Sequence, residues 1–329
     1  MLGVRIISQL QTIARDFGVG RALLSYYYLP MSKLRDSIRE GGPWEQRRAE
    51  LGRLEMVTAA RTLRILSVAE GKQQLQVHFL TGSKYWYQTL FCAWSLQVNS
   101  PVRITPVIYD DGTLTSEHVG YISRAIPWTK VVWISSIESK LDQVLPIQRF
   151  PELRSRRLSY PHLRKLTDIH CSSEGWTLVL DSDMLFYREP RFILEWLSAS
   201  DMPCHMVDAM HSYGYSTALM ESLVGGPIPQ LVNVGFCGFK SSSIDWEKLE
   251  YWCSTLIARE GKHYYLEQAL SAMLLANQSR KAAPQSEYVV LPSLDEGQKP
   301  TAVLHHYVAH SKRSYFQYGW RLLLSNAYQ

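Results

Sequence analysis

The sequence predicts an α/β fold, in which a mostly parallel sheet is flanked by helices on both faces. From residue 75 onward, short apolar segments typical of strands alternate with helical segments of ten or more residues. That alternation is the pattern of a parallel sheet connected by helices. The 329 residues, of which 46% are hydrophobic and 20% charged, are enough to form a substantial core in one large domain or two smaller ones.

The expected elements follow one another in a regular order. Strands are expected at residues 75–82, 102–112, 130–135, 176–183, 202–209 and 229–240. Helices are expected at residues 87–98, 115–126, 159–173, 246–260 and 264–277. In open sheets of this kind, ligands bind at the carboxyl ends of the strands. We therefore expect the functional site at that edge.

Residues 1–74 differ in pattern from the rest of the chain. Apolar residues recur there at helical spacing, which predicts a helical N-terminal extension, with the main domain at 75–329. Packing on the main domain would explain this extension. A membrane-surface or partner-binding role would also explain it, supported by its basic residues Arg5, Arg15, Arg21, Lys33 and Arg35.

Charge and cysteine content limit the classes of protein. A net charge of +5 fits anionic ligands such as phosphates, or acidic membrane, and is too small to indicate nucleic acid. The five cysteines are odd in number and contain no C-x-x-C pair, which indicates buried thiols in a reducing compartment. The sequence contains neither a secretory signal nor an apolar run suited to span a membrane. We expect a cytoplasmic protein, with peripheral membrane contact through the N-terminal helices left open.

Residues 177–190, TLVLDSDMLFYREP, place two carboxylates one residue apart at the end of a strand. Asp is depleted in strands and enriched just after them, so Asp181 and Asp183 are expected where a buried strand reaches the surface. Side chains two residues apart on an extended segment point the same way. Two carboxylates that face one point repel each other unless a cation or a proton lies between them.

Three interpretations of this D-x-D pair compete. The two residues can be solvated turn carboxylates. A phosphatase of the haloacid dehalogenase type needs small residues after the second Asp and a downstream G-D-x-x-x-D, whereas this chain has Met184 and Leu185 and no such motif. The third interpretation is a Mn²⁺ or Mg²⁺ site that binds a diphosphate, because both cations prefer carboxylate and phosphate oxygens.

Five segments, in one order, resemble GT-A-fold glycosyltransferases, and most closely glycosyltransferase family 8, the group of glycogenin and the lipopolysaccharide galactosyltransferases. VLDSDMLF (179–186) resembles the family's metal-binding segment, and LVNVGFCGFK (231–240) resembles its F-N-x-G segment. YYLEQALSAML (264–274) resembles D-Q-D-x-x-N, and VLHHYVAHSKRSYF (303–316) resembles H-x-x-G-x-x-K-P-W. Tyr85 and Ser95 keep the family's ten-residue spacing.

The resemblance implies a role for each matching residue. It implies metal binding by Asp181, Asp183 and His306. It implies donor binding by Thr81, Tyr85, Asp181, Gly235 and Lys312, and by Arg164 or the adjacent Lys165. It implies that Gln268, Glu267 and Asn233 line the reacting sugar.

The resemblance also implies a reaction. A sugar would pass, with retention of anomeric configuration, from a nucleotide-diphosphate donor to a saccharide, lipid-linked or protein acceptor. The nucleotide would be UDP, as is usual in the family, and the metal would be Mn²⁺ or Mg²⁺. From the residues themselves, Asp208 and His211, just past a strand, are further candidates on the acceptor side, and a plain loop role would explain them equally well. Five aromatic residues could form a saccharide-stacking wall or could belong to the core: Trp86, Tyr213, Tyr215, Tyr315 and Trp320.

The sequence departs from the family in places that matter. Gly82, Ser83 and Lys84 stand where the family has acidic residues that help to read uracil, and Ala309 replaces the Gly of the closing motif. Two other classes of function stay open: a sugar nucleotidyltransferase, whose triphosphate loop TGSKYW would match poorly, and a catalytically silent binding protein. Release of free sugar from a donor without an acceptor would separate the enzyme from both.

Overall fold

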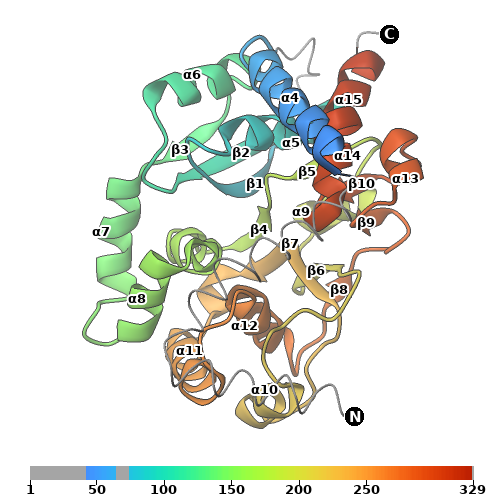
Figure 1. Ribbon diagram of the computed structural model, residues 1–329. Helices are drawn as coiled ribbons and strands as arrows, with labels where there is room; N and C mark the ends of the chain where they lie inside the picture. The colour runs from blue at the N-terminus through green and yellow to red at the C-terminus, as the bar shows by residue number, and fades with distance from the viewer. Residues whose placement is uncertain (1–41, 64–73, 328–329) are drawn as a thin grey trace, which may run out of the picture. The chain divides into compact units, whose positions relative to one another are not determined.

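The computed structural model describes residues 42–63 and 74–327 (Figure 1). The chain divides into two compact units, Met1–Arg53 and Leu54–Gln329. Most of the helical extension predicted for residues 1–74 lies outside the described residues and stays a prediction. One helix expected within it is present as α4 (Gly42–Ala60).

A central sheet of seven strands carries the site. Its strands are β1 (Gln74–Thr81), β2 (Arg103–Asp110), β3 (Lys130–Val132), β4 (Trp176–Leu180), β6 (Cys204–Val207), β7 (Val232–Lys240) and β8 (Lys281–Ala282). They lie in the order β3-β2-β1-β4-β7-β6-β8. Neighbouring strands are parallel except in the two pairs that β7 makes, with β4 and with β6. The predicted mostly parallel sheet is confirmed.

A second sheet of three short strands lies at the carboxyl end of β4. It consists of β5 (Met184–Phe186), β9 (Tyr288–Val290) and β10 (Leu304–His306), in the order β5-β10-β9. Strands β5 and β10 are antiparallel, and His306 is paired with Met184. This register places the end of β10 beside the residue that precedes β5, which is Asp183.

Helices cover both faces of the central sheet (Figure 1). Alternate residues of β4 point to opposite faces: Leu178 and Leu180 belong to one apolar core, and Val179 belongs to the other. The first core packs against α5 (Trp86–Val98), α6 (Ser116–Ala125), α9 (Arg191–Ser198) and α15 (Trp320–Ala327). The second packs against α7 (Ile134–Val144), α8 (Pro151–Ser159), α10 (Thr217–Val224), α11 (Trp246–Glu260) and α12 (Leu266–Leu275).

Two of the expected elements take a different form in the structure. The strand expected at 130–135 ends at Val132, because Ile134, Ile137 and Leu141 continue the apolar run with helical spacing and form α7. The helix expected at 159–173 is present from Pro161 to Cys171, but it begins as a 3₁₀ turn, Pro161–Leu163, and contains a π-helical segment, Lys165–Ile169.

The prediction of buried thiols is confirmed: all five cysteines are free and buried. Among the described residues, the structure contains no helix with the length and apolar character needed to cross a membrane.

Candidate functional site

Asp181 and Asp183 flank the sharp turn between β4 and β5. The backbone N–H of Asp181 donates to the Gly235 carbonyl at 2.7 Å, and the Asp183 carbonyl accepts from the Tyr307 N–H at 2.9 Å. The two residues are thus held by different sheets, β7 of the central sheet on one side and the end of β10 on the other. As predicted, this carboxylate pair lies where a buried strand reaches the surface.

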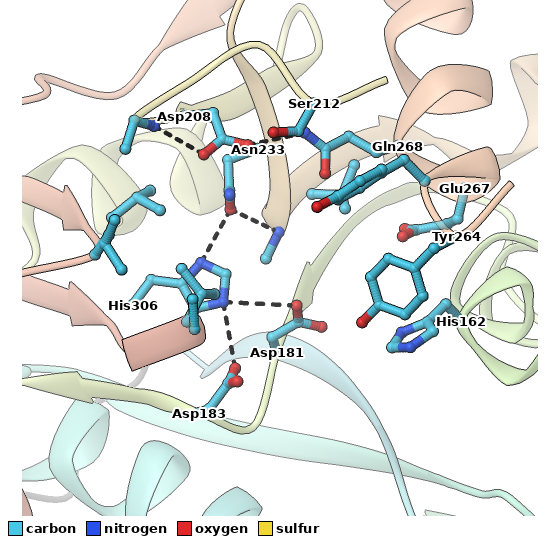
Figure 2. Close-up of a pocket in the computed structure, with 18 of the residues that line it drawn as sticks. His162, Asp181, Asp183, Asp208, Ser212, Asn233, Tyr264, Glu267, Gln268 and His306 are labelled. Carbon is cyan, nitrogen blue, oxygen red and sulfur yellow. Dashed lines mark hydrogen bonds and ion pairs between the residues drawn. The ribbon is translucent and has the colours of Figure 1, made fainter. Parts of the chain in front are cut away.

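His306 completes a cluster with the two carboxylates (Figure 2). Its Nε2 lies 3.2 Å from Asp183 Oδ1 and 3.8 Å from Asp181 Oδ2. One ligand atom from each of the three residues lies within 4.8 Å of the other two. Two carboxylates and one imidazole form a donor set suited to Mn²⁺, and the carboxylates suit Mg²⁺ as well.

The tautomer of His306 follows from its neighbours. Asn233 Oδ1 accepts a hydrogen bond from the Gly235 N–H at 3.0 Å and lies 3.0 Å from His306 Nδ1. Because this oxygen can only accept, Nδ1 must carry a proton and donate it, so Nε2 is the ring nitrogen that remains for a metal. Nε2 is buried and makes no hydrogen bond of acceptable geometry, even to the carboxylate at 3.2 Å. A buried nitrogen without such a partner, aimed at two carboxylates, fits a metal ligand whose other nitrogen is held by a supporting residue.

Gly235 makes room for this imidazole. A Cβ atom at position 235 would lie 2.2 Å from His306 Cε1 and 2.7 Å from Met184 Cε. The F-N-x-G resemblance therefore has a physical basis here. Asn233 orients the ring, and Gly235 leaves the space that the ring occupies.

Two lysines bring positive charge to the cluster. Lys312 Nζ lies 3.1 Å from Asp183 Oδ2. Lys165 Nζ lies 2.8 Å from Asp181 Oδ1 and 3.4 Å from Glu267 Oε2. Burial would raise the pKa of Asp183, but His306 and Lys312 outweigh it and hold that pKa well below its usual range. Burial would lower the pKa of Lys165, but the carboxylates of Asp181 and Glu267 raise it above its ordinary value.

A cavity of about 400 Å³ opens over the cluster. Nine of the twelve predicted site residues line it: Lys165, Asp181, Asp183, Asn233, Gly235, Glu267, Gln268, His306 and Lys312. The structure thus brings the predicted metal-binding and sugar-lining residues together, although they come from segments far apart in the sequence. Asp208 also lines the cavity.

Three predicted donor-binding residues, all in the described part of the chain, lie outside this lining. Thr81 is buried and accepts a hydrogen bond from the Thr89 hydroxyl at 2.8 Å. Tyr85 is 40% exposed just before α5. Arg164 donates to the Asp111 carbonyl at 2.5 Å. Of the two adjacent basic residues that the sequence left open, Lys165 is the one that reaches the cavity.

Of the two roles left open for the five aromatic residues, a stacking wall or the core, the structure supports the core. All five are buried in the apolar cores: Trp86, Tyr213, Tyr215, Tyr315 and Trp320. The aromatic residues that do line the cavity are Tyr160, Tyr264 and Tyr265, together with the imidazole of His162. Tyr264 is 63% exposed, and its ring lies 5.2 Å from that of His162. In the sequence, Tyr160 and His162 come shortly before Lys165, and Tyr264 and Tyr265 come shortly before Gln268. This closeness to predicted site residues was the one feature by which the sequence could have indicated them.

Ala309 lies in the cavity wall with a backbone φ of +47°. This is the left-handed region, which favours glycine, and it is the position where the resembling family has Gly. We expect Ala309→Gly to stabilise the protein by roughly 0.5–1 kcal/mol, after allowing for the larger chain entropy of Gly in the unfolded state. Urea denaturation measures this change, and a less stable variant would show that the strain is absent.

Glu267 gives the folded state a pH dependence. Burial raises the pKa of this carboxyl to about 7, although Lys165 opposes the shift. Because the folded-state pKa lies above the unfolded value, the folded state binds more protons, and stability falls as pH rises from about 4.5 to 7. We expect Glu267→Gln to remove this slope. Relative to wild type it should gain roughly 1–3 kcal/mol of unfolding free energy between pH 4.5 and 8.

Denaturant unfolding at a series of pH values measures this difference. Glu247→Gln, at an exposed position, is the matched control and should leave the pH profile of the wild type unchanged. Parallel profiles for wild type and Glu267→Gln would contradict the assignment.

The comparisons with known proteins bear on the fold. No protein-family model matches the chain, and no curated protein matches it. The solved structure of mouse xyloside xylosyltransferase 1 has a TM-score of 0.50 and 11% identity, over 71% of this chain and 97% of that chain. The galactosyltransferase LgtC, in complex with donor and acceptor sugar analogues, has a TM-score of 0.52 and 13% identity, over 77% of this chain and 95% of that one. The fold is therefore the GT-A fold, as the sequence motifs led us to expect.

Proposed function

We propose that this protein is a metal-dependent glycosyltransferase that transfers a sugar from a nucleotide-diphosphate donor, a UDP-sugar, to an acceptor with retention of configuration. The observation that carries the proposal is the Asp181–Asp183–His306 cluster, with Lys312 beside it, at the mouth of a cavity on the GT-A fold. The neighbours' fold supports the class of reaction, and the donor set supports the metal.

The cluster is built to receive a diphosphate. A divalent cation held by the cluster would neutralise negative charge on the departing diphosphate. Lys312, whose side chain is 46% exposed, can turn from Asp183 toward a phosphate oxygen. Lys165 is buried and held between two carboxylates, so it fixes Asp181 and keeps positive charge beneath the leaving group.

The other side of the cavity is suited to the sugar. As the bond from sugar to phosphate lengthens, positive charge develops on the sugar, and oxygen atoms of the cavity wall can stabilise it. Gln268 lies there, close to Asp208. In a transfer with retention, the acceptor hydroxyl attacks from the side of the leaving phosphate, and that phosphate takes the proton.

The experiment that tests this proposal is the release of nucleoside diphosphate from a panel of nucleotide sugars, without an acceptor and with or without Mn²⁺. We expect slow release from a UDP-sugar that depends on Mn²⁺. A nucleotidyltransferase would release pyrophosphate from a nucleoside triphosphate instead, and a binding protein would release nothing.

We propose a cytoplasmic location, supported by the five free thiols. The helical extension predicted for residues 1–74 would then either provide peripheral membrane contact or pack on the main domain.

A further inference from the structure

Both hydrogens of the Gln268 side-chain amide are committed to protein acceptors. Nε2 donates to Asp208 Oδ2 at 2.8 Å and to the Val232 carbonyl at 2.9 Å. Because both partners accept, the nitrogen and the oxygen of this amide are distinguished by its surroundings. The oxygen Oε1 is the polar atom of Gln268 that remains for the cavity. Figure 2 shows Asp208 and Gln268 on one side of the cavity, with Asp181 and Asp183 on the other.

We propose that Asp208 is a positioning residue that fixes the Gln268 amide so that its carbonyl oxygen faces the reacting sugar. A flipped amide would place Oε1 against two other oxygens, Asp208 Oδ2 and the Val232 carbonyl, and would turn its N–H groups toward the sugar. Such N–H groups would repel the positive charge that develops there, whereas a carbonyl oxygen attracts it. This inference rests on the proposed glycosyl transfer and adds a residue to it.

Asp208 is itself held rigidly. Its Oδ1 accepts from the Ala209 N–H at 2.7 Å, and its own N–H donates to the Leu231 carbonyl at 2.7 Å. Leu231 has a φ of +56°, a left-handed conformation that is unusual for a residue other than glycine. Strained backbone of this kind persists where the surrounding structure fixes it, and it occurs often at active sites.

A β-bulge in the pairing of β6 with β7 positions both Asn233 and the Val232 carbonyl. Strand β6 pairs His205 with Cys237 and then Met206 with Asn233, so three residues of β7 between these partners are left out of the ladder. The bulge turns Asn233 toward His306 and leaves the Val232 carbonyl beside Gln268. Bulges next to active sites re-aim side chains in this way. The same distortion therefore positions the metal-binding side and the sugar side of the cavity.

A double-mutant cycle tests the proposal. The readout is Mn²⁺-dependent release of UDP from the UDP-sugar, without an acceptor. We expect Asp208→Ala and Gln268→Ala each to lower the rate about 10²-fold. Because Asp208 acts through Gln268, the double variant should lose about 10²-fold rather than the roughly 10⁴-fold that independent roles would give. The KM for the donor and the Mn²⁺-dependent thermal shift by UDP should stay as in the wild type, which also shows that the variants are folded.

Two further variants complete the design. Asp208→Asn keeps the shape of the side chain but presents one acceptor where the aspartate presents two, so its rate should lie between those of the wild type and Asp208→Ala. Asp201→Ala removes an exposed carboxylate paired with Lys281 and should match the wild type.

The outcomes distinguish a failure of the positioning role of Asp208 from a failure of the proposed glycosyl transfer. Multiplicative losses in the double variant would overturn the positioning role. So would an Asp208→Ala variant that loses transfer to an acceptor but keeps the acceptor-independent release, because that pattern belongs to a residue that binds the acceptor. A wild-type protein that releases no nucleoside diphosphate from any donor would refute the proposed function itself.

Discussion

Replacing Asp183 by alanine is expected to abolish Mn²⁺-dependent binding of a nucleoside diphosphate. Asp183 has one oxygen 3.2 Å from His306 Nε2 and the other 3.1 Å from Lys312 Nζ, so it connects the two other groups proposed to hold the metal and the diphosphate. Loss of a supporting residue around a metal commonly costs 10- to 100-fold in affinity. Loss of a direct ligand should therefore weaken binding by at least about 10²-fold.

Isothermal titration of UDP into the protein at fixed Mn²⁺ measures this effect. Asp183→Asn separates charge from shape. It keeps one oxygen but removes the negative charge, so it should also bind poorly. Asp245→Ala, which removes an exposed carboxylate at the start of α11, is a suitable control and should bind as the wild type does. Undiminished binding by Asp183→Ala would mean that the diphosphate is held elsewhere.

Replacing Gly235 by alanine is expected to damage both stability and metal-dependent binding. The added Cβ would lie 2.2 Å from His306 Cε1, a distance at which the imidazole has to move. The ring would then lose its hydrogen bond to Asn233 and its place between the carboxylates. We expect a loss of roughly 1–3 kcal/mol in the free energy of unfolding, which is the usual range for overpacking, and a weakening of UDP–Mn²⁺ binding of at least about 10-fold.

Gly120→Ala is the matched control for this variant. Gly120 lies in α6, and a Cβ there would meet nothing within 4 Å. Since Ala is the better helix former, this control should be neutral or slightly stabilised. Denaturant unfolding and UDP titration of both variants give the comparison. If Gly235→Ala behaves like Gly120→Ala, the imidazole is not confined as the structure indicates.

The sequence was sufficient to predict the carboxylate pair Asp181 and Asp183 at the end of a strand, for a physical reason. An apolar strand followed by two carboxylates at a spacing of two is a local pattern, and strand β4 shows it directly. His306 was accessible only through the resemblance of its segment. Its approach depends on pairing between β5 and β10, which are three residues each and too short to show a period of two.

Other features of the site could not be predicted because they depend on tertiary packing. Arg164 and Lys165 are neighbours in the sequence, and the π-helical segment that begins at Lys165 decides which of them faces the cavity. Aromatic residues in a core and in a binding wall look alike in a sequence, so the sequence left both roles open for the five aromatic candidates. Asp208 and Gln268 belong to different parts of the chain, and they are in contact beside a bulge in the pairing of β6 with β7. No local sequence pattern predicts this bulge.

The most direct test of the metal–diphosphate site is the thermal unfolding of the wild-type protein with UDP, GDP, CDP or ADP, each with and without Mn²⁺. A ligand that binds only the folded state raises the stability by an amount set by its concentration relative to its dissociation constant. At a concentration 100-fold above that constant, the gain is about 2.7 kcal/mol. We expect UDP to raise the unfolding temperature only when Mn²⁺ is present. No shift with any of the four nucleotides, in either condition, would contradict the account.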